Sequence, residues 1–276
     1  MSKIVYLDTN IFDHILHKKH GVTREDYLAL SKAIELGKIV VPLSFLNFEE
    51  ALSAWETNPD EAINKIRLIS DIGDWQKMLK PPEELLADDI RSYEKHNSAA
   101  VPFFEDPSLQ YELRKLGNHT RININNLLEI VRRVKNEKEQ FKKTNEELRI
   151  RLLEEIRNLK YTPDFYDYWG TLALDFTREL IKEVGLTEQF KYLLICELLE
   201  LRSVKLCVGY SLSFIYGQGF EKKIPNLGDS RDMKHAVLAS AADIFVTHDG
   251  NLKEIMKRIP IENFEVCDLH ELLEKI

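Results

Sequence analysis

The pattern of apolar and polar positions divides the chain into three parts. Near the N-terminus, short apolar runs at residues 3–7 and 38–41 alternate with stretches of helical periodicity, and this order predicts an α/β layer fold. The C-terminal part repeats the pattern, with apolar runs at residues 243–246 and 264–267. Between them, from residue 59 to about residue 216, helical periodicity dominates and little indicates a strand.

Capping and stop residues delimit the expected elements. Thr9 or Asn10 is expected to cap a helix after the first strand, and Ser44 a helix after the second. Pro42 is expected to end the second strand. Residues 121–159 contain no Gly or Pro and predict a long helix or a helical hairpin.

The two α/β parts are expected to form one discontinuous domain. It would consist of residues 1–58 and 225–276, built around a central parallel sheet, with residues 59–224 as a large all-helical insertion.

Composition is typical of a soluble globular protein. Hydrophobic residues make up 44% and charged residues 30% of the 276 positions. No run of eighteen apolar residues indicates a membrane span, and the opening segment is too short and acidic for a signal peptide. Three cysteines, Cys196, Cys207 and Cys267, match no zinc spacing and suit a reducing compartment. We therefore expect a cytoplasmic protein with no membrane contact.

Charge is distributed unevenly along the chain. The net charge of −8 argues against indiscriminate nucleic-acid binding, although an acidic metal site would itself contribute to it. Residues 110–160 hold 13 Lys/Arg and 8 Asp/Glu, a net of +5, so the remainder carries −13. These basic residues could follow an RNA backbone, but interleaved glutamates favour a solvated, salt-bridged helix face.

Two aspartates follow predicted strands directly or closely. Asp8 follows the first apolar run, and Asp249 comes three residues after the run at 243–246. Each could simply cap the next helix, because Asp is a favoured N-cap residue. Ligands of parallel α/β sheets bind at the carboxyl ends of strands, so two such aspartates together favour a site.

Further carboxylates lie near the beginnings of predicted helices. Glu49 and Glu50 follow the second strand, while Asp229 and Asp232 stand three apart and share a helix face. Acidic residues also commonly compensate the helix dipole at this position. Four carboxylates from these segments would suit Mg²⁺ or Mn²⁺, which prefer oxygen ligands and can stabilise charge on a phosphodiester.

Three segments together resemble the PIN-domain nucleases, a family that includes the VapC-like toxins. In chain order, these segments are IVYLDTNIF, VVPLSFLNFEEALSA and RDMKHAVLASAADIFVTHDGNL. The resemblance covers under half of the chain, roughly residues 1–58 and 225–276. It implies a three-layer α/β/α fold, an Mg²⁺ or Mn²⁺ site and endonucleolytic cleavage of RNA. Many members are toxins paired with an antitoxin protein, and many form homodimers.

By this resemblance, Asp8, Asp232 and Asp249 are expected to bind metal and act in catalysis. The fourth acid is Glu49 or Glu50. Glu50 is favoured because Ala51 and Leu52 follow it, as small and apolar residues follow the family glutamate, and Glu49 would then be solvated.

Other polar residues are expected around these acids. Asn10 and Thr247 resemble residues that orient the aspartates or bind phosphate, and Asp229 would add a ligand or lie at the rim. His235 is expected to be structural, and strand alternation is expected to direct His248 away from Asp249.

Two other functions compete with the nuclease. An inactive PIN-like scaffold would bind RNA or a protein partner through the helical insertion. A haloacid-dehalogenase-type phosphatase also uses an aspartate after its first strand, but that family has Asp-x-Asp where this chain has Asp8, Thr9 and Asn10.

Overall fold

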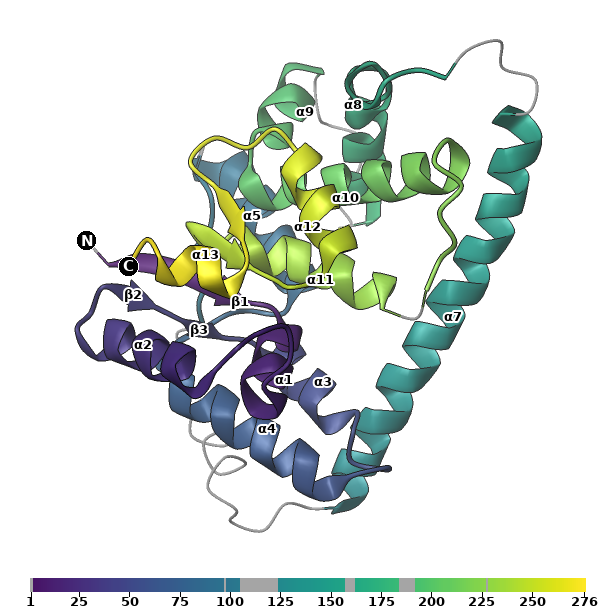
Figure 1. The fold of residues 1–276 in the computed structure, drawn as a ribbon. Helices are drawn as coiled ribbons and strands as arrows, with labels where there is room; N and C mark the ends of the chain where they lie inside the picture. The colour runs from purple at the N-terminus through teal and green to yellow at the C-terminus, as the bar shows by residue number, and fades with distance from the viewer. Residues whose placement is uncertain (1, 97, 105–123, 157–161, 184–191, 227) are drawn as a thin grey trace.

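The computed structural model describes residues 2–96, 98–104, 124–156, 162–183, 192–226 and 228–276. Its centre is a parallel sheet of four strands in the order β2-β1-β5-β6 (Figure 1). The strands are β1 (Lys3–Leu7), β2 (Ile39–Val40), β5 (Ile244–Val246) and β6 (Glu265–Cys267). Strands from both ends of the chain therefore pair in one sheet, as the apolar runs predicted, and the α/β class is confirmed.

Alternation along the strands assigns side chains to the two faces of the sheet. Val5 and Leu7 of β1 belong to one hydrophobic cluster, together with Ile244 and Val246 of β5. Tyr6, between Val5 and Leu7, belongs to a second cluster. Because successive strand residues point in opposite directions, apolar side chains lie on both faces of the sheet, and both faces must be covered by other elements.

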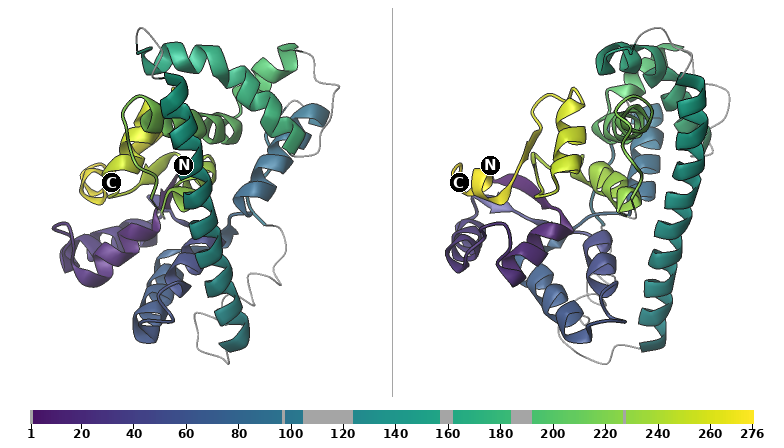
Figure 2. Two further views of the ribbon diagram at one scale, coloured as in Figure 1. Left: turned by 90° about the vertical axis from the view of Figure 1, so that its right-hand side faces the viewer. Right: turned by 45° about the vertical axis from the view of Figure 1, so that its right-hand side comes forward.

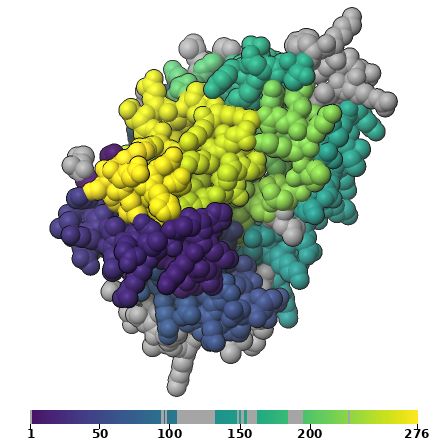
Figure 3. Space-filling model, in the orientation of Figure 1, coloured from purple at the N-terminus to yellow at the C-terminus, as the bar shows by residue number. Residues whose placement is uncertain are grey.

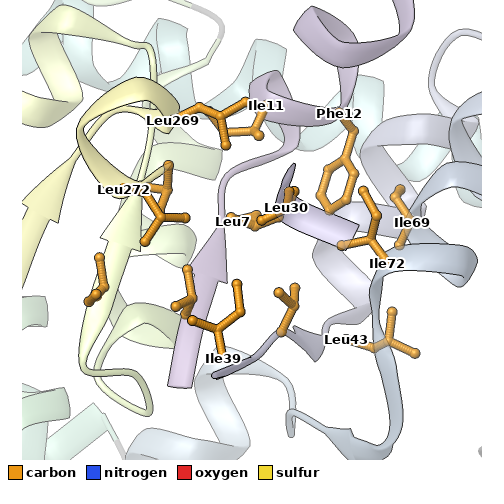
Figure 4. Packing of buried hydrophobic residues seen from close by; sticks show 14 of the residues in the cluster. Leu7, Ile11, Phe12, Leu30, Ile39, Leu43, Ile69, Ile72, Leu269 and Leu272 are labelled. Carbon is orange, nitrogen blue, oxygen red and sulfur yellow. The ribbon is translucent and has the colours of Figure 1, made fainter. Parts of the chain in front are cut away.

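Helices pack on both faces. The first cluster draws on α1 (Thr9–His17), α2 (Arg24–Glu35), α3 (Phe45–Leu52), α4 (Pro59–Ile72) and α13 (Leu269–Leu273). Figure 4 shows Leu7 of β1 surrounded by leucines, isoleucines and a phenylalanine from these helices. The second cluster draws on α10 (Arg202–Gly219), α11 (Asp229–Ala239) and α12 (Gly250–Arg258).

The middle of the chain is not all-helical, contrary to expectation. Pro42 begins a further strand, β3 (Pro42–Leu43), which pairs in parallel with β4 (Asp74–Met78). Pro42 can do so because its missing N–H falls at a strand beginning, where no ladder bond is lost. Ile69 of α4 and Met78 of β4 pack in the same cluster as β1. The expected boundary at residue 58 therefore cuts through a shared core, and the division into two domains stays a prediction.

Four further helices are described: α5 (Pro82–His96), α7 (Ile124–Ile156), α8 (Phe165–Glu183) and α9 (Tyr192–Leu199). Helices α5, α8 and α9 pack with α10 in a third hydrophobic cluster, to which the described residues of α7 do not belong. The expected long helix is α7, a single helix of 33 residues that runs along the right-hand side of the molecule in Figure 1 and faces the viewer in the left panel of Figure 2. It contacts α3, α10 and α11. None of the described helices is both long and apolar enough to span a membrane.

The two ends of the chain lie side by side. The N-terminal and C-terminal segments pack against each other on the face shown in Figure 3. This packing brings Asp8, which follows β1, to the same sheet edge as the residues after β5.

Candidate active site

The carboxyl ends of β1 and β5 position the first acidic group. These strands are parallel neighbours with Leu7 opposite Val246, so Asp8 and Thr247 emerge together at one edge. The Thr247 hydroxyl donates a hydrogen bond of 2.6 Å to Asp8 Oδ2. Only 5% of Asp8 is exposed, so this bond and its neighbours set the direction of its carboxylate.

Asn10 links the two strand ends a second time. Its Nδ2 donates to Asp8 Oδ2 at 2.5 Å and to Thr247 Oγ1 at 3.0 Å, while its Oδ1 accepts from the backbone N–H of His248 at 3.1 Å. Asn10 and Thr247 therefore both orient Asp8, as the sequence led us to expect.

Helix α1 does not use the cap that the sequence indicated. Neither Thr9 nor Asn10 is its N-cap; Asp8 holds that position, and its side chain bonds no helix amide. The carboxylate of Asp8 is instead directed toward Thr247 and Asn10. The simple capping explanation for Asp8 is therefore wrong.

Asp249 acts as a helix cap as well as a member of the site. One of its oxygens, Oδ1, accepts from the N–H of Leu252 at 2.8 Å and caps α12. Its own N–H donates to Thr247 Oγ1 at 3.0 Å. Thr247 thus connects Asp249 to Asp8.

The structure separates the two neighbouring glutamates of α3. Glu50 Oε2 lies 3.0 Å from His235 Nε2, and Glu50 Oε1 lies 3.6 Å from the ammonium of Lys138 on α7. Glu49 turns toward Arg231 and Arg133 and forms ion pairs with both, and with 23% of its side chain exposed it is only partly solvated. Glu50 is thus the glutamate that lies beside Asp8.

His235 of α11 lies between the acids, which its expected structural role did not foresee. It is 1% exposed, and its Nε2 is 3.5 Å from Asp8 Oδ1 as well as 3.0 Å from Glu50. Its Nδ1 shares a hydrogen bond of 2.8 Å with the Tyr6 hydroxyl. Burial lowers the pKa of His235, but the charge of Asp8 and the bond to Glu50 outweigh it and raise the pKa overall.

Asn47 is a buried polar residue of the site that sequence reasoning missed. Its Nδ2 donates to the carbonyl of Leu7 at 3.2 Å, and its Oδ1 accepts from the Thr9 hydroxyl at 3.1 Å. It therefore ties α3, which carries Glu50, to the end of β1. The available signal was an asparagine inside an otherwise apolar helix face, because buried amides need partners.

The aspartates of α11 complete the acidic group. Burial raises the pKa of Asp232 well above its ordinary value, and the charges of Asp8, Asp249, Asp229 and Glu50 raise it further. Asp229 is buried, accepts from the N–H of Asn226 at 2.7 Å and has a pKa raised to about 6, mainly by burial. Asp232 is therefore near enough to Asp8, Asp249 and Glu50 for their charges to act on it.

The electrostatics of Asp8 and Glu50 differ. Burial raises the pKa of Asp8, against the charge of His235 and the bond from Thr247. Burial also raises the pKa of Glu50, but the bond and charge of His235 and the charge of Lys138 lower it overall to about 2. Glu50 is therefore ionised at neutral pH with its charge compensated, whereas Asp8 and Asp232 carry less compensated charge.

This donor set fits a hard divalent cation. Asp8, Glu50 and His235 each offer a ligand atom, and these three atoms lie within 4.8 Å of one another, whereas the expected ligands Asp232 and Asp249 do not belong to this close group. The repulsion felt by Asp232 would be relieved by a cation among the acids, and carboxylate oxygens are the ligands that Mg²⁺ and Mn²⁺ prefer.

His248 lies outside the acidic group, because its Nδ1 is 2.5 Å from His14 Nδ1 and its Nε2 accepts from the N–H of Leu269. The basic stretch of α7 reaches the group through Lys138, which pairs with Glu50, and Arg133 pairs with Glu49. Lys142 pairs with Glu146 one turn later, as expected of a salt-bridged helix face. The side chains of Arg151 and Arg157 lie outside the described part of the chain.

A cleft lined with charged side chains borders the site. It has a volume of about 450 Å³ between α3, α5, α7 and α11. Four cations and three carboxylates line it: Lys80, Arg133, Arg231, Lys234, Glu49, Glu83 and Glu137. Its lining therefore carries a formal charge of +1 beside a cluster of acids.

Comparison of the chain with protein-family models, with curated proteins and with solved structures finds no match.

Proposed function

We propose that this chain is a metal-dependent endoribonuclease with a PIN-like three-layer domain. Asp8, Glu50, Asp232 and Asp249 would bind Mg²⁺ or Mn²⁺. The observation that carries the proposal is the close approach of Asp8, Glu50 and His235, whose ligand atoms lie within 4.8 Å of one another. Burial raises the pKa of the neighbouring Asp232, and the charges of Asp8, Asp249, Asp229 and Glu50 raise it further. So many acids converge at the edge of a parallel sheet where α/β proteins bind their ligands.

A bound divalent ion would lower the pKa of a water molecule and stabilise negative charge on the phosphodiester. Residues of the chain hold the proposed metal ligands in fixed orientations. Thr247 and Asn10 hold Asp8 in one orientation, and His235 holds Glu50. Lys138 of α7 lies at the edge of the acidic group, where it can exchange Glu50 for a substrate phosphate.

The neighbouring cleft supports a polyanionic substrate. Its four cations exceed its three carboxylates, and it begins where Glu49 and Arg231 adjoin Glu50 and Asp232 in the sequence. A phosphate backbone could lie along it and exchange the glutamate partners of Arg133 and Arg231 for phosphate oxygens.

The test is metal-dependent cleavage of an RNA pool. We expect cleavage with Mg²⁺ or Mn²⁺ that EDTA abolishes, and Asp8→Asn should lower the rate by roughly 100-fold or more, because a fixed anionic ligand is lost. Asp71→Asn, an exposed change on α4, is the matched control and should cleave normally. If the wild-type protein neither cleaves any RNA nor binds Mn²⁺ in calorimetry, the proposal fails.

A second candidate is an inactive scaffold that binds RNA or a protein through the middle of the chain. The pairing of Glu50 with Lys138 and His235 favours it, because one acid is already neutralised. This function predicts partner binding that is unchanged by EDTA and by Asp8→Asn. An antitoxin-like protein and a homodimer also stay predictions that co-purification and sedimentation would test.

A further inference from the structure

A second pocket adjoins the acidic group on the side of α10. It has a volume of about 260 Å³ and lies between the C-terminal half of α10, residues 223–226, and the first turns of α11 and α12. We call it the α10 pocket. Its lining includes Ser213, Phe214, Gln218, Asn226, Asp229 and Asn251.

Two buried polar side chains in this lining have no protein partner. Gln218 and Ser213 are each 1% exposed. Neither amide atom of Gln218 nor the hydroxyl of Ser213 bonds any residue in the described part of the chain. Because an unpaired buried polar group destabilises the folded state, a molecule that pairs with these groups gains binding free energy from them.

The α10 pocket shares one residue with the candidate active site. Asp229 lines the pocket, and its charge contributes to the raised pKa of Asp232. Asn251 lies two residues after Asp249, in the first turn of α12. A nucleotide next to the bond being cut could therefore direct its base into the pocket while its phosphate stays at the acids.

The chemistry of the lining selects the ligand. The Gln218 amide offers a donor beside an acceptor, which is how glutamine reads the edge of a base, and unstacked RNA bases expose such edges. Phe214 and Ile255 provide apolar walls. The lining also holds Lys223, but its ammonium pairs with Glu221 and Glu254, so Asp229 and Lys223 together give no net positive charge for a phosphate group. The volume is below the roughly 300–1,000 Å³ of drug-sized sites, which suits one ring system.

We propose that the α10 pocket is a nucleobase subsite, which binds the base of a nucleotide adjacent to the scissile bond through Gln218. The proposal rests on the ribonuclease function proposed above. It assigns part of the substrate choice to α10, a helix from the middle of the chain.

The first experiment measures binding without any cleavage. Adenosine, guanosine, cytidine and uridine are each titrated into the full-length protein in EDTA and followed by ligand-observed NMR. We expect at least one to bind, and Gln218→Met to weaken that binding by about ten-fold or more. Gln140→Met, at an exposed position on α7, is the matched control and should bind like the wild type.

Stability controls accompany these variants. The folded state of Gln218→Met should be at least as stable as the wild type, since the lost amide has no protein partner. If Gln218→Met does not fold, Ser213→Ala, which removes a smaller unpaired group, takes its place. Failure of every nucleoside to bind up to its solubility limit overturns the proposal, and so does equal binding by the wild type and the folded variant.

The second experiment separates this proposal from the nuclease itself. Cleavage sites in an RNA pool are mapped for the wild type and Gln218→Met with Mn²⁺. We expect the base preference at one position beside the cut to weaken while cleavage continues. Unchanged preferences overturn the subsite and leave the nuclease intact. Absence of all cleavage, with nucleoside binding that depends on Gln218, overturns the nuclease and keeps the base site.

Discussion

Thr247 joins three parts of the candidate site through one hydroxyl group. It donates to Asp8 Oδ2 and accepts from Asn10 Nδ2 and from the N–H of Asp249. A hydroxyl has one donor and two acceptor positions, so every hydrogen-bonding position of this fully buried group is used. The direction of the Asp8 carboxylate therefore depends on Thr247.

Thr247→Val keeps the shape of this side chain and removes its bonds. We expect the affinity for Mn²⁺ to fall by about 10- to 100-fold, the usual effect of losing a residue that orients a metal ligand. Titration calorimetry of the folded variant measures it. Thr171→Val, at an exposed position on α8, should bind Mn²⁺ like the wild type. Equal affinities in both variants would show that Thr247 does not orient Asp8.

At the scale of elements, a glycine sets how closely α10 approaches α12. A Cβ added at Gly209 would lie 2.7 Å from Cγ2 of Ile259, the C-cap residue of α12. The other end of α12, which Asp249 caps, contributes Asn251 and Ile255 to the pocket that Gln218 of α10 also lines. The two helices therefore contact each other both at Gly209 and at the α10 pocket.

Gly209→Ala and Gly170→Ala form a matched pair. Both replace a helical glycine, which by itself favours the folded state by up to about 1 kcal/mol. At Gly170 nothing lies within 4 Å of the new Cβ, whereas Gly209→Ala must displace Ile259. We expect Gly209→Ala to unfold more easily than Gly170→Ala by about 1–3 kcal/mol in urea. Equal free energies of unfolding for the two variants would show that α12 shifts to accommodate the new methyl group with no loss of stability.

At the scale of the whole molecule, folding gathers negative charge from both ends of the chain. Burial and mutual repulsion raise the pKa values of Asp8, Asp229 and Asp232. For each of these, the folded state holds its proton more tightly than the unfolded state. Their contribution to stability is therefore present at low pH and is lost as pH rises. The pKa of Glu50 is lowered to about 2, so its contribution to stability is instead lost when the pH falls toward that value.

The apo protein should therefore become less stable as pH rises. In EDTA, we expect the melting temperature to fall as pH rises from about 4 to beyond about 6, the range in which Asp229 loses its proton. Asp232→Asn should reduce this fall. Mg²⁺ should raise the melting temperature more at pH 8 than at pH 5, because ionised acids bind it better. Equal stabilisation at both pH values would contradict a carboxylate metal site.

Local pattern was enough to identify most elements and the candidate acids. Strand β1 and helices α2 and α7 follow from apolar runs, caps and the lack of Gly and Pro. Strand β4 was missed because its sequence, DWQKM, is polar and lacks the alternation that indicates a strand. Its pairing with β3 supplies the stabilisation that its own residues do not indicate.

The sequence by itself determined where acids stand relative to strand ends and helix beginnings, because these follow from local periodicity. Only the tertiary structure decided that Glu50 rather than Glu49 lies beside Asp8, that His235 lies between them, and that α7 brings Lys138 to the same place. It also created the pocket around Gln218. These facts depend on contacts between residues far apart along the chain, and burial there determines which charges are paired and which repel.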